Sequence, residues 1–225
     1  MYLERYKDYY NLVVYDETTP SAASIPADAQ VWDDKAKIIS FLGYQDYCRA
    51  FWWRTPRILE MAHTQANLVM GASNWDDAIT KIIDACTSIK RNGKPLGVIQ
   101  FWGHGMPGVP MMGEHRLSYP AFKDNSSSLY ARLCQMRDLI SPATYLWFRC
   151  SSFFSGEMGR NAVEHFTNFF RCKLVGHTHK IGFIQSGCYV VDIKDKPRWP
   201  VTDAAQSFFY EPNTILATNF FPCVE

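Results

Sequence analysis

The chain has little of several features that each define a class of protein. No apolar run approaches the roughly 20 residues that a membrane helix requires, so the sequence predicts no spanning segment and no membrane partner. The first eight residues include an acid within four positions and no hydrophobic stretch, which predicts no secretory signal. The 23 basic and 22 acidic residues nearly cancel, and a net charge of +1 predicts no nucleic-acid partner.

Cysteine is present but too scattered for either of the common cysteine-rich arrangements. The seven cysteines lie at positions 48, 86, 134, 150, 172, 188 and 223, an odd number without a Cys-x-x-Cys pair. This spacing argues against a disulfide framework and against a cysteine-rich zinc site. It predicts reduced thiols in a cytoplasmic setting, where one of them is free to do chemistry.

The composition is that of folded material rich in large flat side chains. Of the 225 residues, 47% are hydrophobic and 15% are aromatic, which excludes disorder for most of the chain. This length fits one domain with additions. We expect a single domain over 1–225, with a surface loop over 17–31, a helical insertion over 33–66 and a β-rich tail over 183–225.

Strands and helices alternate through the middle of the chain. Apolar runs predict strands over 11–16, 67–70, 95–102, 143–149, 173–176 and 189–193, with a small hairpin near 109–112. Helical spacing predicts three helices: one that starts at a capping box over Ser73–Asp76 and ends at Asn92, and two over 126–137 and 156–170. This alternation predicts an α/β fold with a mostly parallel sheet flanked by helices. Its strands then present their carboxyl ends along one edge, where ligands bind.

Two neighbouring strand ends carry side chains that can act together. Strand 95–102 runs into Trp102-Gly-His104-Gly105, and strand 143–149 runs into Arg149-Cys150-Ser151. One crossover separates these strands, so we expect His104 and Cys150 to face each other. An imidazole near a thiol lowers the pKa of the thiol and can protonate a leaving amine. Gly105 has no Cβ, so its backbone N–H can approach a developing oxyanion.

This pattern resembles the caspase-like cysteine peptidases, and most closely their uncharacterised bacterial members. Those proteins are three-layer sandwiches with a His-Gly after one strand and a Cys after the next, roughly 50 residues later; here the separation is 46 residues. The segments 156–159 and 175–182 also resemble that family. The resemblance implies a cysteine endopeptidase with His104 as general acid and base, Cys150 as nucleophile, and the Gly105 and Cys150 amides as oxyanion hole. It implies a peptide or protein substrate and no metal or organic cofactor.

The sequence departs from the caspase pattern in ways that affect the expected site. The Gln-Ala-Cys-x-Gly signature is replaced by Phe-Arg-Cys-Ser-Ser, so Ser151 is a possible alternative nucleophile, which would make a weak or inactive peptidase. No pair of arginines forms an acidic-residue pocket, so a preference for aspartate is not implied. We expect the cleft to be lined by Trp102, Arg149, His177 and His179.

Two other interpretations stay open. A caspase-like scaffold without activity could serve binding or assembly, with the aromatics Trp32, Trp199 and 208–210 either on a partner surface or packed against the domain. Alternatively, Gly176-His177-Thr-His179 matches the Gly-His-x-His ending of calcineurin-like metallophosphoesterases, in which two imidazoles hold a metal. The three carboxylate motifs that those enzymes also need are absent, so this interpretation is the weaker one. Nucleophile-elbow, dinucleotide and P-loop motifs do not occur.

Overall fold

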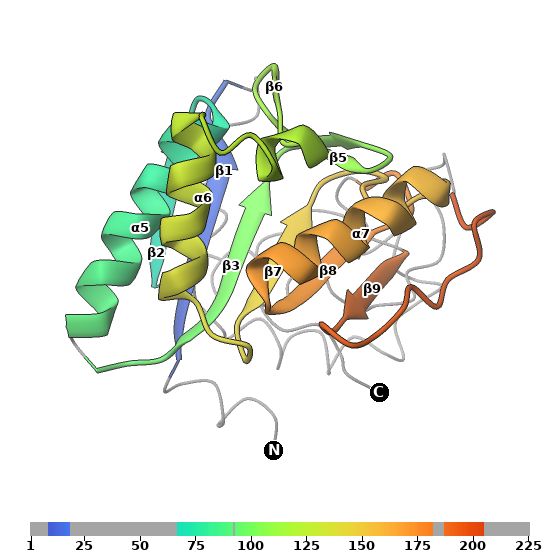
Figure 1. Ribbon diagram of the computed structural model, residues 1–225. Coiled ribbons are helices and arrows are strands. Elements are labelled where there is room, and N and C mark those ends of the chain that lie inside the picture. Colours follow the sequence, from blue (N-terminus) through green and yellow to red (C-terminus); the bar gives the residue numbers. More distant parts are fainter. Residues whose placement is uncertain (1–8, 19–66, 92, 182–186, 205–225) are drawn as a thin grey trace, which may run out of the picture.

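The apolar runs form a six-stranded sheet with the order β2-β1-β3-β7-β8-β9 (Figure 1). The computed structural model describes residues 9–18, 67–91, 93–181 and 187–204. Five strands are parallel, and the last pairs antiparallel with its neighbour. The strands are β1 (Tyr10–Asp16), β2 (Leu68–Ala72), β3 (Leu96–Trp102), β7 (Tyr145–Arg149), β8 (Lys173–His177) and β9 (Cys188–Val191). The predicted α/β class with a mostly parallel sheet is confirmed.

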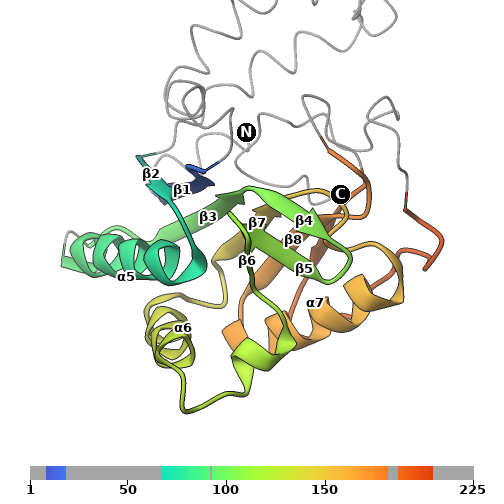
Figure 2. The same cartoon turned by 90° about the horizontal axis from the view of Figure 1, so that it is seen from above.

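Three helices connect these strands and pack on the same side of the sheet (Figure 2). They are α5 (Trp75–Arg91), α6 (Ser128–Leu139) and α7 (Gly156–Phe170). Alternation along each strand divides the buried side chains into two sets. Phe101 and Phe148 point towards the helices, whereas Val98, Trp147 and Val175 form a buried cluster on the opposite face. The predicted helical insertion over 33–66 lies outside the described residues, as do 19–31 and 205–225.

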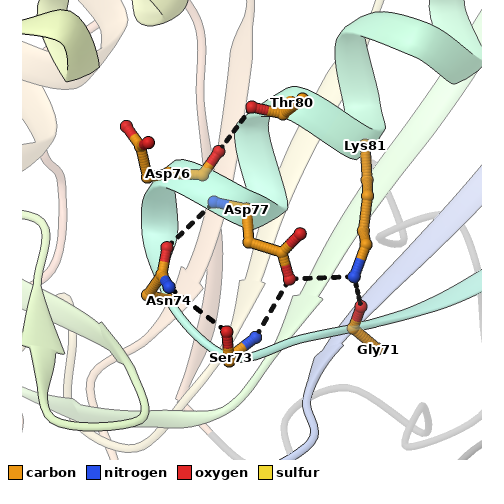
Figure 3. Close-up of polar contacts among 7 residues, drawn as sticks. All are labelled: Gly71, Ser73, Asn74, Asp76, Asp77, Thr80 and Lys81. Atoms are coloured by element: carbon orange, nitrogen blue, oxygen red, sulfur yellow. Dashed lines mark hydrogen bonds and ion pairs between the residues drawn. The ribbon is translucent and has the colours of Figure 1, made fainter.

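The first of these helices begins one residue later than the predicted capping box. The N-cap is Asn74, whose Oδ1 accepts a hydrogen bond from the Asp77 N–H at 2.9 Å (Figure 3). Asp77 Oδ2 in turn accepts from the Ser73 N–H at 3.2 Å and from Lys81 Nζ at 2.8 Å. Asn and Ser are equally favourable N-cap residues, and Asp76 and Asp77 each provide an acid three residues after one of them. The prediction of Ser73–Asp76 was therefore wrong by one residue.

A small antiparallel sheet follows β3, and it confirms the predicted hairpin near 109–112, to which it adds a third strand. It contains β4 (His104–Met106), β5 (Val109–Met112) and β6 (His115–Arg116), and it lies beyond the carboxyl ends of the parallel strands in Figure 1. Its first turn is Pro107–Gly108, where Gly108 has φ +75° and donates its N–H to the Phe153 carbonyl at 2.9 Å. At the other end, the Gly113 N–H donates to the buried Asp16 carboxylate at 2.8 Å. The small sheet is thus fixed both to the loop after β7 and to the last residue of β1.

None of the helices in the described ranges is long and apolar enough to cross a membrane.

A short 3-10 helix, η4 (Tyr119–Phe122), joins β6 to α6 and packs against α7 through aromatic contacts. The rings of Phe122 and Phe166 lie 4.5 Å apart between centroids. His165 of α7 stacks on Tyr119 at 3.7 Å. These contacts fix η4 to the carboxyl-terminal half of α7.

Candidate functional site

The structure brings the ends of β3 and β7 into direct contact. These strands are paired through to Trp102 and Arg149, so the segments that follow them leave the sheet side by side. A Cβ built on Gly105 would lie 3.0 Å from Cys150 Sγ and 2.7 Å from the Ser151 carbonyl oxygen. Only glycine therefore fits at position 105. The backbone of β4 packs against the thiol without an intervening side chain.

The strand register leaves the Gly105 N–H outside the ladder of the small sheet. Gly105 is paired with Pro110, whose carbonyl oxygen accepts from the Leu117 N–H at 3.0 Å on the far side of β5. In an antiparallel ladder, the N–H and C=O of one residue point to the same neighbour. Gly105 and Pro110 are therefore a non-hydrogen-bonded pair. The Gly105 N–H points to the open side of β4, as an oxyanion donor requires.

The thiol and the imidazole have different surroundings. His104 is exposed at the start of β4, whereas Cys150 is only 2% exposed and packs in the core on the helix side of the sheet. Because successive residues of a strand point to opposite faces, Gly105 rather than His104 is the residue of β4 that faces the sulfur. Burial raises the pKa of the Cys150 thiol far above its ordinary value. In this conformation the thiol is protonated at neutral pH.

The loop from β7 to α7, residues 150–155, is held by backbone and side-chain bonds to the segment that extends β8. The Ser152 N–H donates to the His179 carbonyl and the Phe154 N–H donates to the His177 carbonyl, both at 2.9 Å. Ser151 Oγ accepts from the Ile181 N–H at 3.1 Å and donates to the Ile181 carbonyl at 3.3 Å. The proposed alternative nucleophile therefore has its hydroxyl engaged in anchoring this loop.

Trp199 covers the same loop from the carboxyl-terminal side. Its indole stacks on the Phe154 ring with centroids 4.9 Å apart and planes 7° from parallel, and its Nε1–H donates to the Phe154 carbonyl at 2.8 Å. Trp199 is only 2% exposed. Of the two interpretations of this aromatic residue, packing against the domain is confirmed and a free partner surface is wrong. Trp32 and 208–210 lie outside the described residues.

Arg149 lies on the sheet face opposite Cys150, in an aromatic and amide environment. Its Nη1 donates to Gln100 Oε1 at 3.0 Å, and the same oxygen accepts from Trp102 Nε1 at 2.7 Å. The guanidinium carbon lies 4.3 Å from the Trp102 ring and 5.0 Å from the Trp147 ring, which are cation–π contacts. Burial lowers the pKa of Arg149 to about 9, so it is still a cation at neutral pH.

The two histidines of the Gly-His-x-His segment have separate partners. His177 is fully buried, and its Nε2 accepts from Trp147 Nε1 at 3.2 Å. His179 Nε2 lies 2.6 Å from Asp203 Oδ1. Within the part of the chain that the structure describes, no three His, Cys, Asp or Glu side chains are grouped so that they could hold a metal ion.

Asp203 is a site residue that the sequence did not indicate. Its Oδ2 accepts from the Tyr189 hydroxyl at 2.7 Å and from Thr178 Oγ1 at 3.0 Å, in addition to the contact with His179. No motif links position 203 to these three residues. Burial raises the pKa of the Asp203 carboxyl, but the hydrogen bonds from Tyr189, His179 and Thr178 outweigh it, and the net pKa is below the ordinary value. The ionised carboxylate therefore fixes the carboxyl-terminal segment to β8 and β9.

The lowered pKa of Asp203 predicts a specific loss of stability in acid. A carboxyl with a depressed pKa in the folded state stabilises the protein above its unfolded value of about 3.9, and this contribution is lost as the pH falls through the folded value. Asp203→Asn should lower the stability at pH 6 and flatten its pH dependence below about pH 4. Urea unfolding of both proteins between pH 3 and 6 measures this. Parallel pH profiles would contradict the assignment.

Three groups of the candidate site lie at one edge of the sheet. An α/β sheet carries a thiol, a glycine backbone with a free N–H and an imidazole at the carboxyl ends of neighbouring parallel strands, where such sheets bind ligands. No protein-family model matches the chain, and neither a curated protein nor a solved structure shows significant similarity to it.

Proposed function

We propose that this chain is a caspase-like cysteine peptidase with Cys150 as its nucleophile and His104 as its general acid and base. The observation that carries the proposal is the contact of the Gly105 backbone with Cys150 Sγ, where β3 and β7 end side by side. The mostly parallel sheet, with the His-Gly segment after β3 and the cysteine after the neighbouring β7, supports this proposal. The predicted cytoplasmic setting and the peptide or protein substrate belong to the same proposal.

The chemistry follows from these groups. His104 accepts the proton of the Cys150 thiol, and the resulting thiolate attacks the carbonyl carbon of a peptide bond. The carbonyl oxygen becomes an oxyanion that the Gly105 and Cys150 N–H groups stabilise. The C–N bond then breaks, and His104 donates a proton to the departing amine. Water, deprotonated by the same imidazole, hydrolyses the thioester and restores the thiol. No metal or organic cofactor takes part in these steps.

The described conformation is a covered state of this site. The sulfur is buried and protonated, and the imidazole is on the solvent side. A turn of the Cys150 side chain, or of loop 150–155 that carries it, out of its core packing is the step that brings sulfur and imidazole together. Activity then depends on how often this loop opens.

A second function is favoured by the burial itself. Cys150 has the surroundings of an inert structural cysteine, and the Ser151 hydroxyl is engaged by the backbone of Ile181. A protein with these properties would be a scaffold or protein-interaction module built on the same fold. The two functions differ in whether Cys150 reacts with a peptide-like electrophile.

A peptidyl electrophile with site-resolved mass spectrometry distinguishes them. We expect labelling of Cys150 in the wild-type protein, and a loss of at least about tenfold in His104→Ala, because the imidazole both activates the thiol and assists bond breaking. His115→Ala removes an exposed imidazole from the same small sheet and should leave the labelling unchanged. Labelling of Cys150 that is absent, or equal in all three proteins, would favour the scaffold.

A further inference from the structure

A short segment after β9 is fixed to the molecule at two anchor points. Residues 197–203, here called the strap, return to the amino-terminal end of α7 in Figures 1 and 2. Trp199 anchors the strap to loop 150–155, because its indole stacks on Phe154 and donates to the carbonyl of that residue. Asp203 anchors it to the ends of β8 and β9 through side-chain hydrogen bonds. The strap thus covers the loop that carries the proposed nucleophile.

The two anchors are joined by a tight turn. The Asp203 N–H donates to the Pro200 carbonyl at 3.0 Å, which closes a β-turn directly after Trp199. Because this turn is held by its own hydrogen bond, a displacement of one anchor is transmitted to the other. The residues at the centre of the turn are exposed, with Val201 at 46%. The strap is not part of either sheet, so it can lift without breaking the strand pairing.

The Asp203 anchor acts on the residues that hold loop 150–155 in place. Its carboxylate accepts from Thr178 Oγ1 at 3.0 Å and lies 2.6 Å from His179 Nε2. The His179 carbonyl in turn accepts the Ser152 N–H at 2.9 Å. His179 therefore binds Asp203 with its side chain and the loop with its backbone, so the loop is held at both ends of the strap.

The Asp203 anchor is closely packed. Thr178 and His179 lie directly on Gly187, where a Cβ would be 2.3 Å from Thr178 Oγ1 and 2.7 Å from His179 Cγ. The side chains of His179 and Asp203 are only 12% and 19% exposed. A carboxylate accepts hydrogen bonds on both oxygens, whereas an amide of the same size turns an NH₂ donor towards groups that donate. Asp203→Asn should therefore release this anchor without changing its volume.

We propose that the strap is an autoinhibitory element of this protein. With both anchors in place, it holds loop 150–155 in the conformation that buries Cys150. Lifting of the strap frees the loop and exposes the thiol. The inference rests on the proposed function in one respect, because the strap inhibits activity only if Cys150 is the nucleophile. The access that the strap allows to Cys150 is measurable separately from catalysis.

Alkylation of Cys150 by iodoacetamide, followed by site-resolved mass spectrometry of the full chain, measures this access. At pH 8 we expect Asp203→Asn to raise the rate at least about tenfold, since the loss of hydrogen bonds to a charged group shifts an opening equilibrium by this much or more. Thr202→Ala shortens an exposed side chain of the same strap and is the matched control, with an unchanged rate. A wild-type rate at Cys150 in Asp203→Asn overturns the proposal.

Cys86 and Cys172 distinguish lifting of the strap from a general loss of stability. Both are buried, and their alkylation rates should stay at the wild-type values in Asp203→Asn. If these rates rise as well, Tyr189→Phe decides, because it removes one hydrogen bond to Asp203 and keeps the aromatic ring. A rise of about threefold or more at Cys150 alone then supports the strap. A rise at all three cysteines, or at none of them, overturns it.

A peptidyl electrophile separates this proposal from the proposed function. If both are correct, Asp203→Asn is also labelled faster by this reagent at Cys150, and His104→Ala in the same background removes the gain. Faster alkylation by iodoacetamide without this dependence on His104 supports the strap and overturns the peptidase.

Discussion

Trp199→Ala is expected to lower the free energy of unfolding by about 3–5 kcal/mol and to expose Cys150. The indole is buried against the Phe154 ring and also donates to the Phe154 carbonyl. Removing it leaves a cavity beside loop 150–155 and an unpaired buried carbonyl. Loop 150–155 then opens more often, so alkylation of Cys150 by iodoacetamide should become at least about tenfold faster at pH 8.

Trp199→Phe is the matched variant that separates the contribution of ring packing from that of the N–H hydrogen bond. It keeps an aromatic ring on Phe154 and loses the N–H donor together with a smaller part of the buried volume, so the expected cost is lower, at about 1–2 kcal/mol. Denaturant unfolding gives both free energies, and site-resolved mass spectrometry gives the alkylation rates. Cys86 and Cys172, buried away from this contact, should keep their wild-type rates. An unchanged rate at Cys150 in Trp199→Ala would show that Trp199 does not control the opening of the loop.

Gly159→Ala is expected to destabilise the protein by about 2 kcal/mol, although alanine is the better helix former. A Cβ at position 159 would overlap the backbone carbonyl group of Phe154, which cannot move away as a flexible side chain could. Helix propensity favours alanine over glycine by only about 1 kcal/mol. Overpacking against fixed backbone costs about 1–3 kcal/mol and sometimes more, so the steric effect wins.

Met158→Ala is the control for this experiment, because its side chain precedes Gly159 in α7 and is 65% exposed. We expect it to change the free energy of unfolding by no more than about 0.5 kcal/mol. Thermal and urea unfolding of both variants measure the difference. A Gly159→Ala protein as stable as the wild type would mean that the start of α7 can shift away from loop 150–155.

The parts of the fold that depend on local pattern were predictable from the sequence. Unbroken apolar runs indicated β3 and β7, and the apolar stripe of α5 is buried as its helical spacing predicted. The contact between the ends of β3 and β7 was predictable because a single crossover connects these two strands. The cap of α5 was misplaced because Ser73 and Asn74 are chemically equivalent candidates, and only packing chooses between them.

The burial of Cys150 in the candidate site was harder to predict, although the sequence around it contained part of the information. Cys150 follows the core residue Phe148 by two positions, and strand alternation places both on the helix side, where a thiol is desolvated. That inference also requires knowing which face of the sheet the helices cover, and the sequence pattern of β7 alone does not show this. The Asp203 contact with His179 joins residues 24 positions apart without a motif, so only the folded structure reveals it.

Phe154 occupies a space that two glycines leave open, Gly176 beside its ring and Gly159 beside its backbone. A Cβ on Gly176 would lie 2.5 Å from the ring, a Cβ on Gly159 would overlap its backbone, and Trp199 closes the remaining side. These four positions share one volume, so their substitutions are not additive. A smaller residue at 154 makes room for alanine at 176, and the pair is expected to be tolerated where the glycine change alone is not. In homologous sequences, residues 154 and 176 should therefore vary together. This covariation would identify the β7–α7 turn even in sequences that have no cysteine at position 150.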